Sequence, residues 1–222
     1  MSFVLQLGRF LIHVHPNEQW SREEFMRSTP HGSIALDGMV KGGPFYDEAT
    51  KRLNLDHHDG VKREATMSTC MQMFFALKGD MMDAFTGIVH VYINDIDQDV
   101  ALAVWQLVNY ALFEGTKDVP SISRLRTLTD RIDITSCACP MKLSDRLNRQ
   151  HSWVFGAYQS FRSSGEMASA SASSLAANLE ATLARLDSFL MNNGEERELN
   201  VDHVILYDGS GFKVIDERGC GN

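Results

Sequence analysis

The sequence predicts an α/β protein with a mostly parallel sheet flanked by helices, followed by a small C-terminal helix and hairpin. Three observations indicate this fold. Short runs rich in β-branched and aromatic residues alternate with helical segments, which is the order typical of parallel sheets. Aspartates and histidines directly follow several of these runs, and strand ends supply the ligand sites of α/β proteins. The length of 222 residues suffices for one large domain with its own hydrophobic core.

Composition and charge restrict the class of protein. The formal net charge is −8, which argues against a broad nucleic-acid-binding surface because such a surface needs a basic stripe. No apolar run approaches the ~20 residues of a membrane span, and the first residues lack the pattern of a secretory signal. The four cysteines are too few and too unevenly spaced for a disulfide scaffold. We therefore expect a cytoplasmic protein with reduced thiols and no membrane association.

Strands and helices are expected to alternate along the chain. The expected strands cover residues 3–15 (broken at Gly8-Arg9), 33–36, 53–55 and 88–93. Ser21 and Glu24 form a capping box, so a short helix is expected to begin there. Further helices are expected over residues 63–77, 100–108, 123–133, 143–161 and 175–186. Residues 201–207 and 212–215 flank a glycine-containing turn, which predicts a hairpin.

The domain organisation follows from these elements. Residues 1–162 form the expected α/β domain with the metal site. Residues 163–174 are rich in serine and alanine, as is typical of a linker or mobile loop. Residues 175–222 contain the C-terminal helix and the hairpin, which we expect to pack on the main domain.

The segment richest in chemistry is Leu53-Asn54-Leu55-Asp56-His57-His58, in which an apolar strand leads into one carboxylate and two imidazoles. Side chains alternate between the two faces of a strand, so these three groups can converge only where the strand ends and the chain turns. Ligands of α/β proteins usually bind at such strand ends. The segment therefore forms a candidate ligand site.

A second acidic group, Asp95, Asp97 and Asp99, lies between the strand 88–93 and the following apolar helix. Helix capping explains one or two of these aspartates, but hardly all three. Their spacing also fits the first positions of a calcium-binding EF-hand loop. That loop needs a glycine and a glutamate where this chain has Val100 and Gln106, so the EF-hand is excluded.

Histidines and a further aspartate near the first strands have two interpretations each. His13 and His15 share one face of a strand, where they either bind a metal or line a polar edge. Asp37 follows the strand 33–36 and either starts a plain turn with Gly38 or contributes a carboxylate to the site.

Arg63 and the pair of aspartates Asp130 and Asp133 also have two interpretations each. Arg63 either holds a substrate phosphate through a bidentate contact or is a solvated arginine at a helix start. Asp130 and Asp133 share one helical face and either add a metal carboxylate or pair with Arg126 and Arg131. We expect surface ion pairs for these two aspartates, because such pairs are abundant.

The tripeptide Asp56-His57-His58 after an apolar strand resembles the signature of the DHH phosphoesterase superfamily. The segment with Asp95 and Asp97 is similar to the D-x-D strand-to-helix motif of that superfamily, with an apolar, alanine-containing helix after it. In most members this acidic motif precedes the tripeptide, whereas here it follows. We therefore assign the role of the first strand to His13 and His15, and the later acidic role to the aspartates.

The resemblance implies a divalent-metal-dependent hydrolase of phosphoester or phosphoanhydride bonds in a nucleotide or another small phosphate-containing substrate. It implies that His57 is a metal ligand, that His58 faces the substrate phosphate or the leaving oxygen, and that Asp37 bridges two metals. Asp56 either ligates a metal or orients its neighbour. Carboxylates and imidazoles without thiolates suit Mn²⁺ or Mg²⁺, or alternatively Zn²⁺ or Fe²⁺. Members commonly carry a C-terminal substrate domain with a glycine-rich, histidine-containing motif, which nothing in this chain matches.

The alternative from another class is a non-catalytic α/β protein that keeps the acidic and histidine pocket for ligand binding or assembly. The two hypotheses differ in whether the carboxylates converge on an open, water-accessible metal position. Dinucleotide-binding, phosphate-binding-loop, serine-hydrolase and zinc-protease motifs do not occur in the sequence. A homo-oligomer is compatible with either hypothesis.

Overall fold

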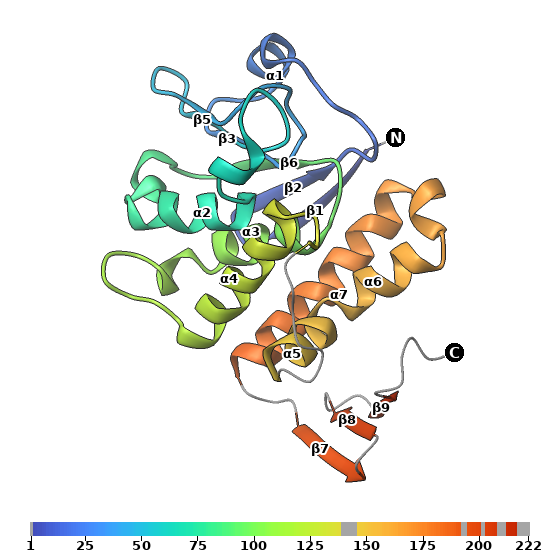
Figure 1. The fold of residues 1–222 in the computed structure, drawn as a ribbon. Helices are drawn as coiled ribbons and strands as arrows, with labels where there is room; N and C mark the ends of the chain where they lie inside the picture. The colour runs from blue at the N-terminus through green and yellow to red at the C-terminus, as the bar shows by residue number, and fades with distance from the viewer. Residues whose placement is uncertain (1, 139–145, 192–194, 201–202, 208–211, 217–222) are drawn as a thin grey trace.

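The computed structural model of the chain describes residues 2–138, 146–191, 195–200, 203–207 and 212–216, and beyond Met191 it describes the backbone alone. A six-stranded sheet lies at its centre (Figure 1). The strands are β1 (Phe3–Leu7), β2 (Phe10–Val14), β3 (Ser33–Leu36), β4 (Phe45–Asp47), β5 (Arg52–Leu55) and β6 (Val89–Ile93). Their order is β1-β2-β6-β3-β5-β4. The four inner strands are parallel, and the two edge strands are antiparallel to their neighbours. The predicted α/β fold with a mostly parallel sheet is confirmed.

The helices lie on both faces of this sheet. They are α1 (Arg22–Ser28), α2 (Thr69–Lys78), α3 (Gln98–Val108), α4 (Pro120–Ile134), α5 (Arg146–Val154), α6 (Gly156–Ser163) and α7 (Ala172–Leu190). Short 3₁₀ turns occur at Arg63–Ala65, Met81–Ala84, Tyr110–Leu112 and Glu166–Ser169. None of these described helices is both long enough and apolar enough to cross a membrane.

The alternation of side chains along the strands divides the interior into two cores. One row of apolar partners crosses the parallel strands and faces the larger core, which also contains residues of α2, α3 and α7: Ile12, Val91, Ile34 and Leu53. Ala35 and Tyr92 point to the opposite face, where they pack with Phe25 of α1 in a smaller core. Burying both faces explains why the inner strands are apolar almost throughout.

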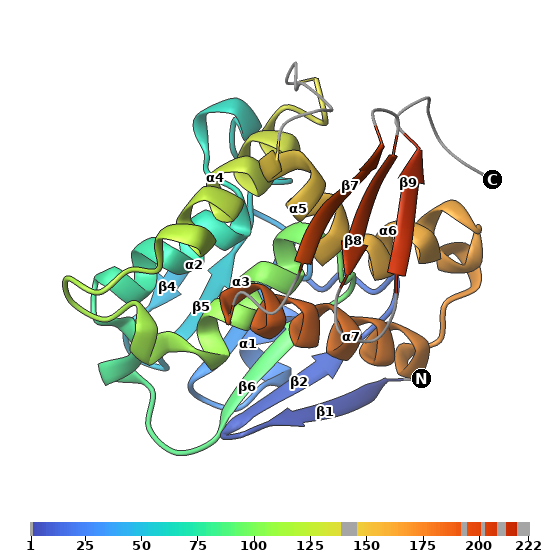
Figure 2. The same ribbon diagram turned by 90° about the horizontal axis from the view of Figure 1, so that it is seen from below.

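The long C-terminal helix α7 belongs to the larger core. Leu175, Leu179 and Leu186 are buried in it, and α7 contacts β1, β2 and α3. Figure 2 shows α7 beside β1 and β2. The helix begins at Ala172, where the Ser171 hydroxyl accepts a hydrogen bond from the Ser174 backbone N–H at 3.1 Å. The serine-rich segment predicted as a linker therefore also holds a 3₁₀ turn and the start of this helix.

Two predicted helices differ from the structure. The helix expected over residues 63–77 begins only at Thr69, because the Arg63 side chain contacts Asp133 and carboxylates of other helices bind the first amides of α2. The helix expected over residues 143–161 is divided into α5 and α6, which meet at Phe155 and Gly156, while residues 143–145 lie outside the described residues. By contrast, the helix predicted after Ser21 is confirmed. It begins with the Ser21 hydroxyl accepting the Glu24 N–H at 3.1 Å.

A second, three-stranded antiparallel sheet contains β7 (Glu195–Asn200), β8 (His203–Tyr207) and β9 (Phe212–Asp216). The predicted hairpin corresponds to β8 and β9, and residues 201 and 202 lie outside the described residues. The strand β7 was not predicted, because its charged sequence lacks the apolar alternation that indicates a strand.

Candidate metal centre

The parallel strands bring the candidate residues to one edge of the sheet. Asp37 follows β3, Asp56 to His58 follow β5, and Asn94 to Asp97 follow β6, so all three segments leave the carboxyl end of a parallel strand. Hydrogen bonds tie these turns together. The Asn94 and Gln19 side-chain amides both donate to the Gly38 carbonyl, at 3.1 and 3.0 Å.

A buried aspartate and two histidines form the first group of possible metal ligands. Oδ1 of Asp37 lies 2.9 Å from Nε2 of His58 and 3.3 Å from Nε2 of His57. The Thr69 hydroxyl also donates to Oδ1 of Asp37, at 3.1 Å. Asp37 has the left-handed φ of 43°, an uncommon conformation that is often found at functional sites. The turn therefore aims the carboxylate at the two imidazoles.

The second group adds the end of α4. Nε2 of His57 lies 2.7 Å from Oδ2 of Asp133, and the ligand atoms of His57, Asp99 and Asp133 all lie within 4.8 Å of one another. Asp133 also accepts a hydrogen bond from Arg63 at 2.8 Å. The prediction of a surface ion pair with Arg126 or Arg131 is therefore wrong for Asp133. Its neighbour Asp130 instead accepts the Ser68 backbone N–H at 2.9 Å.

The His57 side chain is fully buried, and neither of its ring nitrogens makes an aligned hydrogen bond. Oδ2 of Asp133 is likewise buried without one, so the 2.7 Å contact lies off the N–H direction. Buried polar atoms nearly always have a partner. Nε2 of His57 and the nearby carboxylate oxygens converge on one point with no hydrogen bond between them. Atoms of these types are ligands of divalent cations, so a bound cation would give them a partner.

Asp56 binds backbone through one of its two carboxylate oxygens, while the other, Oδ2, is buried without a hydrogen-bond partner. Its Oδ1 accepts N–H bonds from Gly38 at 3.0 Å, from His57 at 2.7 Å and from His58 at 2.9 Å. It therefore joins the turns after β3 and β5 and orients both histidines. Burial raises the pKa of Asp56 against these hydrogen bonds. The bonds to Oδ1 fit the orienting interpretation, and the unpaired Oδ2 fits the metal-ligand interpretation.

Asp99 connects α3 to the start of α2. Its two oxygens accept the backbone N–H groups of Thr69 at 2.7 Å and Cys70 at 2.9 Å. Burial, followed by the charges of Asp37 and Asp133, raises the pKa of Asp99 to about 7. The helix start of α2 thus depends on a carboxylate that also faces the centre.

Asp95 and Asp97 lie beside this centre at the start of α3. Oδ1 of Asp97 caps the helix through the Val100 N–H at 2.8 Å, and Oδ1 of Asp95 accepts the Ile96 N–H at 2.6 Å. Burial, followed by the negative charge of Asp37, raises the pKa of Asp97 well above its usual value. Burial also raises the pKa of Asp95. Carboxylates gathered in this way repel one another unless a cation lies among them.

The pKa values of His57 and His58 are raised, which favours positive charge on the two rings beside the aspartates. Burial lowers the pKa of His57, but the close carboxylates of Asp133 and Asp37 outweigh burial and raise it to about 10. The contact with Asp37 raises the pKa of His58. Burial opposes the charge of Asp37, yet the two histidines hold the pKa of Asp37 well below its usual range. A bound cation would take the place of the histidine protons.

His13 and His15 lie apart from this centre. Nε2 of His13 lies 2.9 Å from Nδ1 of His90, and the ring stacks on Tyr92 with centroids 4.5 Å apart. His15 contacts Glu18 at 3.1 Å. The apolar residues of β2 point to the face of the larger core, so His13 points to the opposite face, where Tyr92 lies. The structure therefore does not bring these two predicted ligands to the other candidates.

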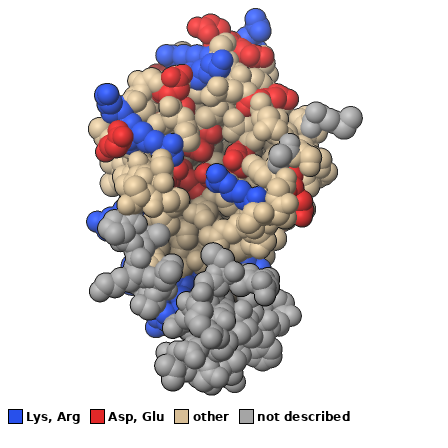
Figure 3. All heavy atoms as spheres, turned by 45° about the vertical axis from the view of Figure 1, so that its right-hand side comes forward, with Lys and Arg blue, Asp and Glu red and all other residues tan. Residues whose placement is uncertain are grey.

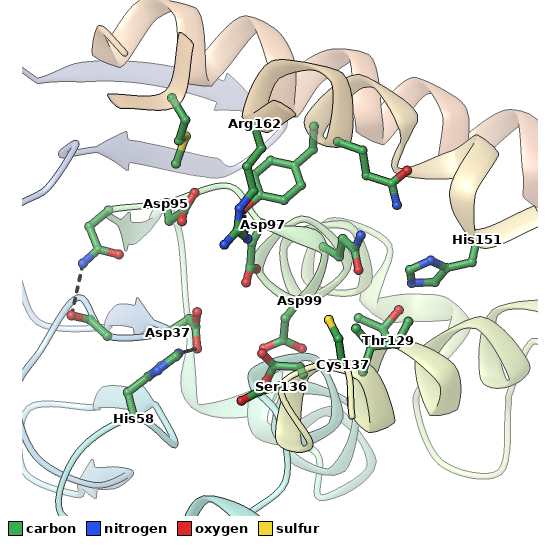
Figure 4. A pocket seen from close by; sticks show the side chains of 18 of the residues that line it. Asp37, His58, Asp95, Asp97, Asp99, Thr129, Ser136, Cys137, His151 and Arg162 are labelled. Atoms are coloured by element: carbon green, nitrogen blue, oxygen red, sulfur yellow. Dashed lines mark hydrogen bonds and ion pairs between the residues drawn. The ribbon is translucent and has the colours of Figure 1, made fainter. Parts of the chain in front are cut away.

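A cavity of about 850 Å³ opens beside the centre and reaches helices α5 and α6. Figure 3 shows acidic side chains around the hollow, with basic side chains next to it. Asp37, His58, Asp95, Asp97, Asp99 and Asp133 line the cavity together with Arg63. In Figure 4, Arg162 reaches toward Asp97, and His151 lies on the far side of the aspartates from His58.

Several of these residues could not be identified as parts of the site from the sequence. Asp99 could have been included, because capping did not explain all three aspartates of its group. Asp133 shares a helical face with Asp130, but nothing in the sequence places that face next to His57. His151 and Arg162 lie in helices whose position against the centre is set by tertiary packing alone.

The fold and the site define an α/β protein with a candidate divalent-metal centre at the carboxyl edge of its sheet. Comparisons with protein-family models, with curated proteins and with solved structures find no match to this chain. The class of activity is therefore argued from the site itself.

Proposed function

We propose that this protein is a divalent-metal-dependent hydrolase of phosphoester or phosphoanhydride bonds in a small phosphate-containing substrate, similar to the DHH phosphoesterases. The observation that carries the proposal is His57. It is buried at the overlap of two groups of possible ligands, and its ring nitrogens lack aligned hydrogen bonds. A structural histidine in a protein core would instead have its polar atoms paired.

The residues that would hold the metal are Asp37, His57, Asp99 and Asp133, with Asp95 and Asp97 on the cavity wall beside them. This donor set of oxygen and imidazole nitrogen suits Mn²⁺ or Mg²⁺, and also Zn²⁺ or Fe²⁺. When bound, such ions lower the pKa of a water and neutralise charge on phosphoryl oxygens.

His58 and Arg63 are the groups suited to contact the substrate. The His58 side chain is 36% exposed and lines the cavity, while its Nε2 is oriented by Asp37. Contact with Asp37 raises the pKa of His58, which favours a protonated imidazole that can hydrogen-bond a phosphate oxygen or protonate a leaving oxygen. Arg63 is fixed by Asp133 beside it, and Nη1 of Arg63 lies 3.5 Å from Nδ1 of His58. A guanidinium there would stabilise negative charge on the phosphoryl group.

The test combines metal binding and phosphate release. We expect the purified protein to bind Mn²⁺ in a calorimetric titration, and to release phosphate from small phosphate esters or anhydrides only with the metal present. The His57→Ala variant should lose both properties. The His31→Ala variant is the matched control, because His31 is exposed and precedes β3 at the opposite edge of the sheet. Metal binding without turnover on any phosphate would favour the non-catalytic binding protein. No Mn²⁺ binding would contradict the proposed hydrolase and would also leave the non-catalytic protein as the alternative.

A further inference from the structure

The cavity extends from the metal centre to a wall made by α4, α5 and α6. Thr129 and Ile132 of α4, Asn148, His151 and Ser152 of α5, and Gln159 of α6 line it. In Figure 4, His151 and Thr129 lie together on one side of Asp99, while Asp37 and His58 lie on the other. A substrate whose phosphate lies at the centre therefore has room for a further group between these helices.

His151 is the least expected member of this wall. Its side chain is buried, with only 3% of the residue exposed, yet Nε2 has no hydrogen-bond partner. Its ring packs against Phe155, with centroids 4.7 Å apart, so the imidazole is held in place by apolar contact. Burial lowers the pKa of His151 to about 4. At neutral pH the ring is therefore uncharged, and it offers one hydrogen bond to a neutral polar group.

The two ends of the cavity differ in charge. Among the described lining residues, the arginines are Arg63 and Arg162, and like His58 they lie next to the aspartates of the centre. The lining residues that share the far end of the cavity with His151 are uncharged, such as Thr129, Asn148 and Ser152. A chain of further phosphates would need cations along its length, whereas a nucleoside or a sugar needs neutral hydrogen-bonding groups.

We infer that His151 is a substrate-binding residue for the organic part of the substrate, and that the substrate is a phosphate ester of a neutral polar group, such as a nucleoside or a sugar. The inference rests on the proposed function, because it places the phosphate at the metal centre. Inorganic polyphosphates are the competing class that this arrangement disfavours.

The experiment compares two sets of probes in the presence of Mn²⁺. One set contains nucleoside monophosphates and sugar phosphates, and the other contains pyrophosphate and tripolyphosphate. Binding is measured by calorimetry and turnover by phosphate release. We expect the best ester to bind more tightly than either inorganic probe. The His151→Ala variant should weaken the binding of that ester by about three- to tenfold, the loss of one neutral hydrogen bond. Its affinity for pyrophosphate and Mn²⁺ should stay unchanged.

Two further variants separate binding from folding. The His151→Gln variant keeps a hydrogen-bonding side chain and should recover part of the ester affinity, while His31→Ala should bind every probe as the unaltered chain does. Thermal denaturation of each variant shows whether it is folded. Tighter binding of the inorganic probes than of every ester, or an equal loss for both sets in His151→Ala, would overturn the inference alone. A chain that binds no Mn²⁺ would overturn both this inference and the proposed function.

Discussion

Nε2 of His57, in the turn after β5, lies 2.7 Å from Oδ2 of Asp133, in the last turn of α4, and neither atom makes an aligned hydrogen bond. This relationship joins the sheet edge to a helix distant in the sequence. Since Asp37 and Asp99 approach the same imidazole, His57 lies at the middle of the acidic centre. The account of function depends on a cation that completes this arrangement.

Replacing Asp133 by asparagine removes one carboxylate from the centre with little change in volume. We expect the Asp133→Asn variant to bind Mn²⁺ about tenfold or more weakly in a calorimetric titration. The Asp130→Asn variant is the matched control on the same helix, because Asp130 caps the Ser68 N–H and is not one of the possible ligands. It should keep both its stability, because asparagine retains an oxygen that accepts the Ser68 N–H, and its Mn²⁺ affinity. Equal metal affinity in the two variants would contradict a role of Asp133 in metal binding.

Variants of Asp56 test whether this residue orients the two histidines or binds the metal itself. The Asp56→Ala variant leaves three backbone N–H groups without their acceptor, and we expect a loss of about 3 kcal/mol in the free energy of unfolding. The Asp56→Asn variant keeps a carbonyl acceptor and should recover much of this stability. If Asp56 orients its neighbours, asparagine should also keep Mn²⁺ binding within about tenfold, since outer partners of ligands contribute effects of that size. Complete loss of Mn²⁺ binding in a folded Asp56→Asn variant would instead identify Asp56 as a ligand.

The buried imidazole of His151 predicts a dependence of stability on pH. Its pKa is lowered from 6.5 to about 4, so the folded state holds the neutral ring. As pH falls below 6.5, the unfolded state takes up a proton that the folded state does not, and stability is lost until about pH 4. The full effect is about 3 kcal/mol.

Denaturant unfolding at several pH values between 7 and 4 measures this effect. The His151→Gln variant cannot take up the proton, so its stability should fall less over this range than that of the unaltered chain. The His31→Gln variant should follow the unaltered chain, because His31 is exposed. Parallel pH profiles for the unaltered chain and His151→Gln would show that the His151 ring is not held neutral.

A variant of His13 distinguishes the metal-binding role that the resemblance suggested from the position that His13 has in the structure. His13 contacts His90 and Tyr92 on the opposite face of the sheet. The His13→Ala variant should therefore bind Mn²⁺ as tightly as the unaltered chain. A loss of Mn²⁺ binding in a folded variant would return His13 to the metal site and contradict the arrangement described above.

Much of the fold could be predicted from local sequence. Apolar runs such as 33–36 and 88–93 are too short for helices and rich in residues that favour strands, and parallel order followed from the helices between them. Helix starts were less predictable. The first turn of α2 is capped by Asp99 and Asp130 of other helices, and no local motif records such a contact.

Only the site residues that directly follow a strand could be predicted from the sequence. Asp37, His57 and His58 follow parallel strands, so their convergence is a property of the sheet. Asp133, His151 and Arg162 reach the cavity from helices whose packing depends on the whole core. The face that His13 points to depends on the strand register, which the two-residue period alone does not fix.

Anomalous diffraction from crystals grown with Mn²⁺ would show whether His57 and the surrounding carboxylates bind the metal. We expect an anomalous peak within about 2.0–2.5 Å of Nε2 of His57 and of carboxylate oxygens from Asp37, Asp99 or Asp133. The peak should be absent from crystals of the His57→Ala variant. A centre without a peak at saturating Mn²⁺, or a peak only at His13 and His90, would rule out His57 as a metal ligand.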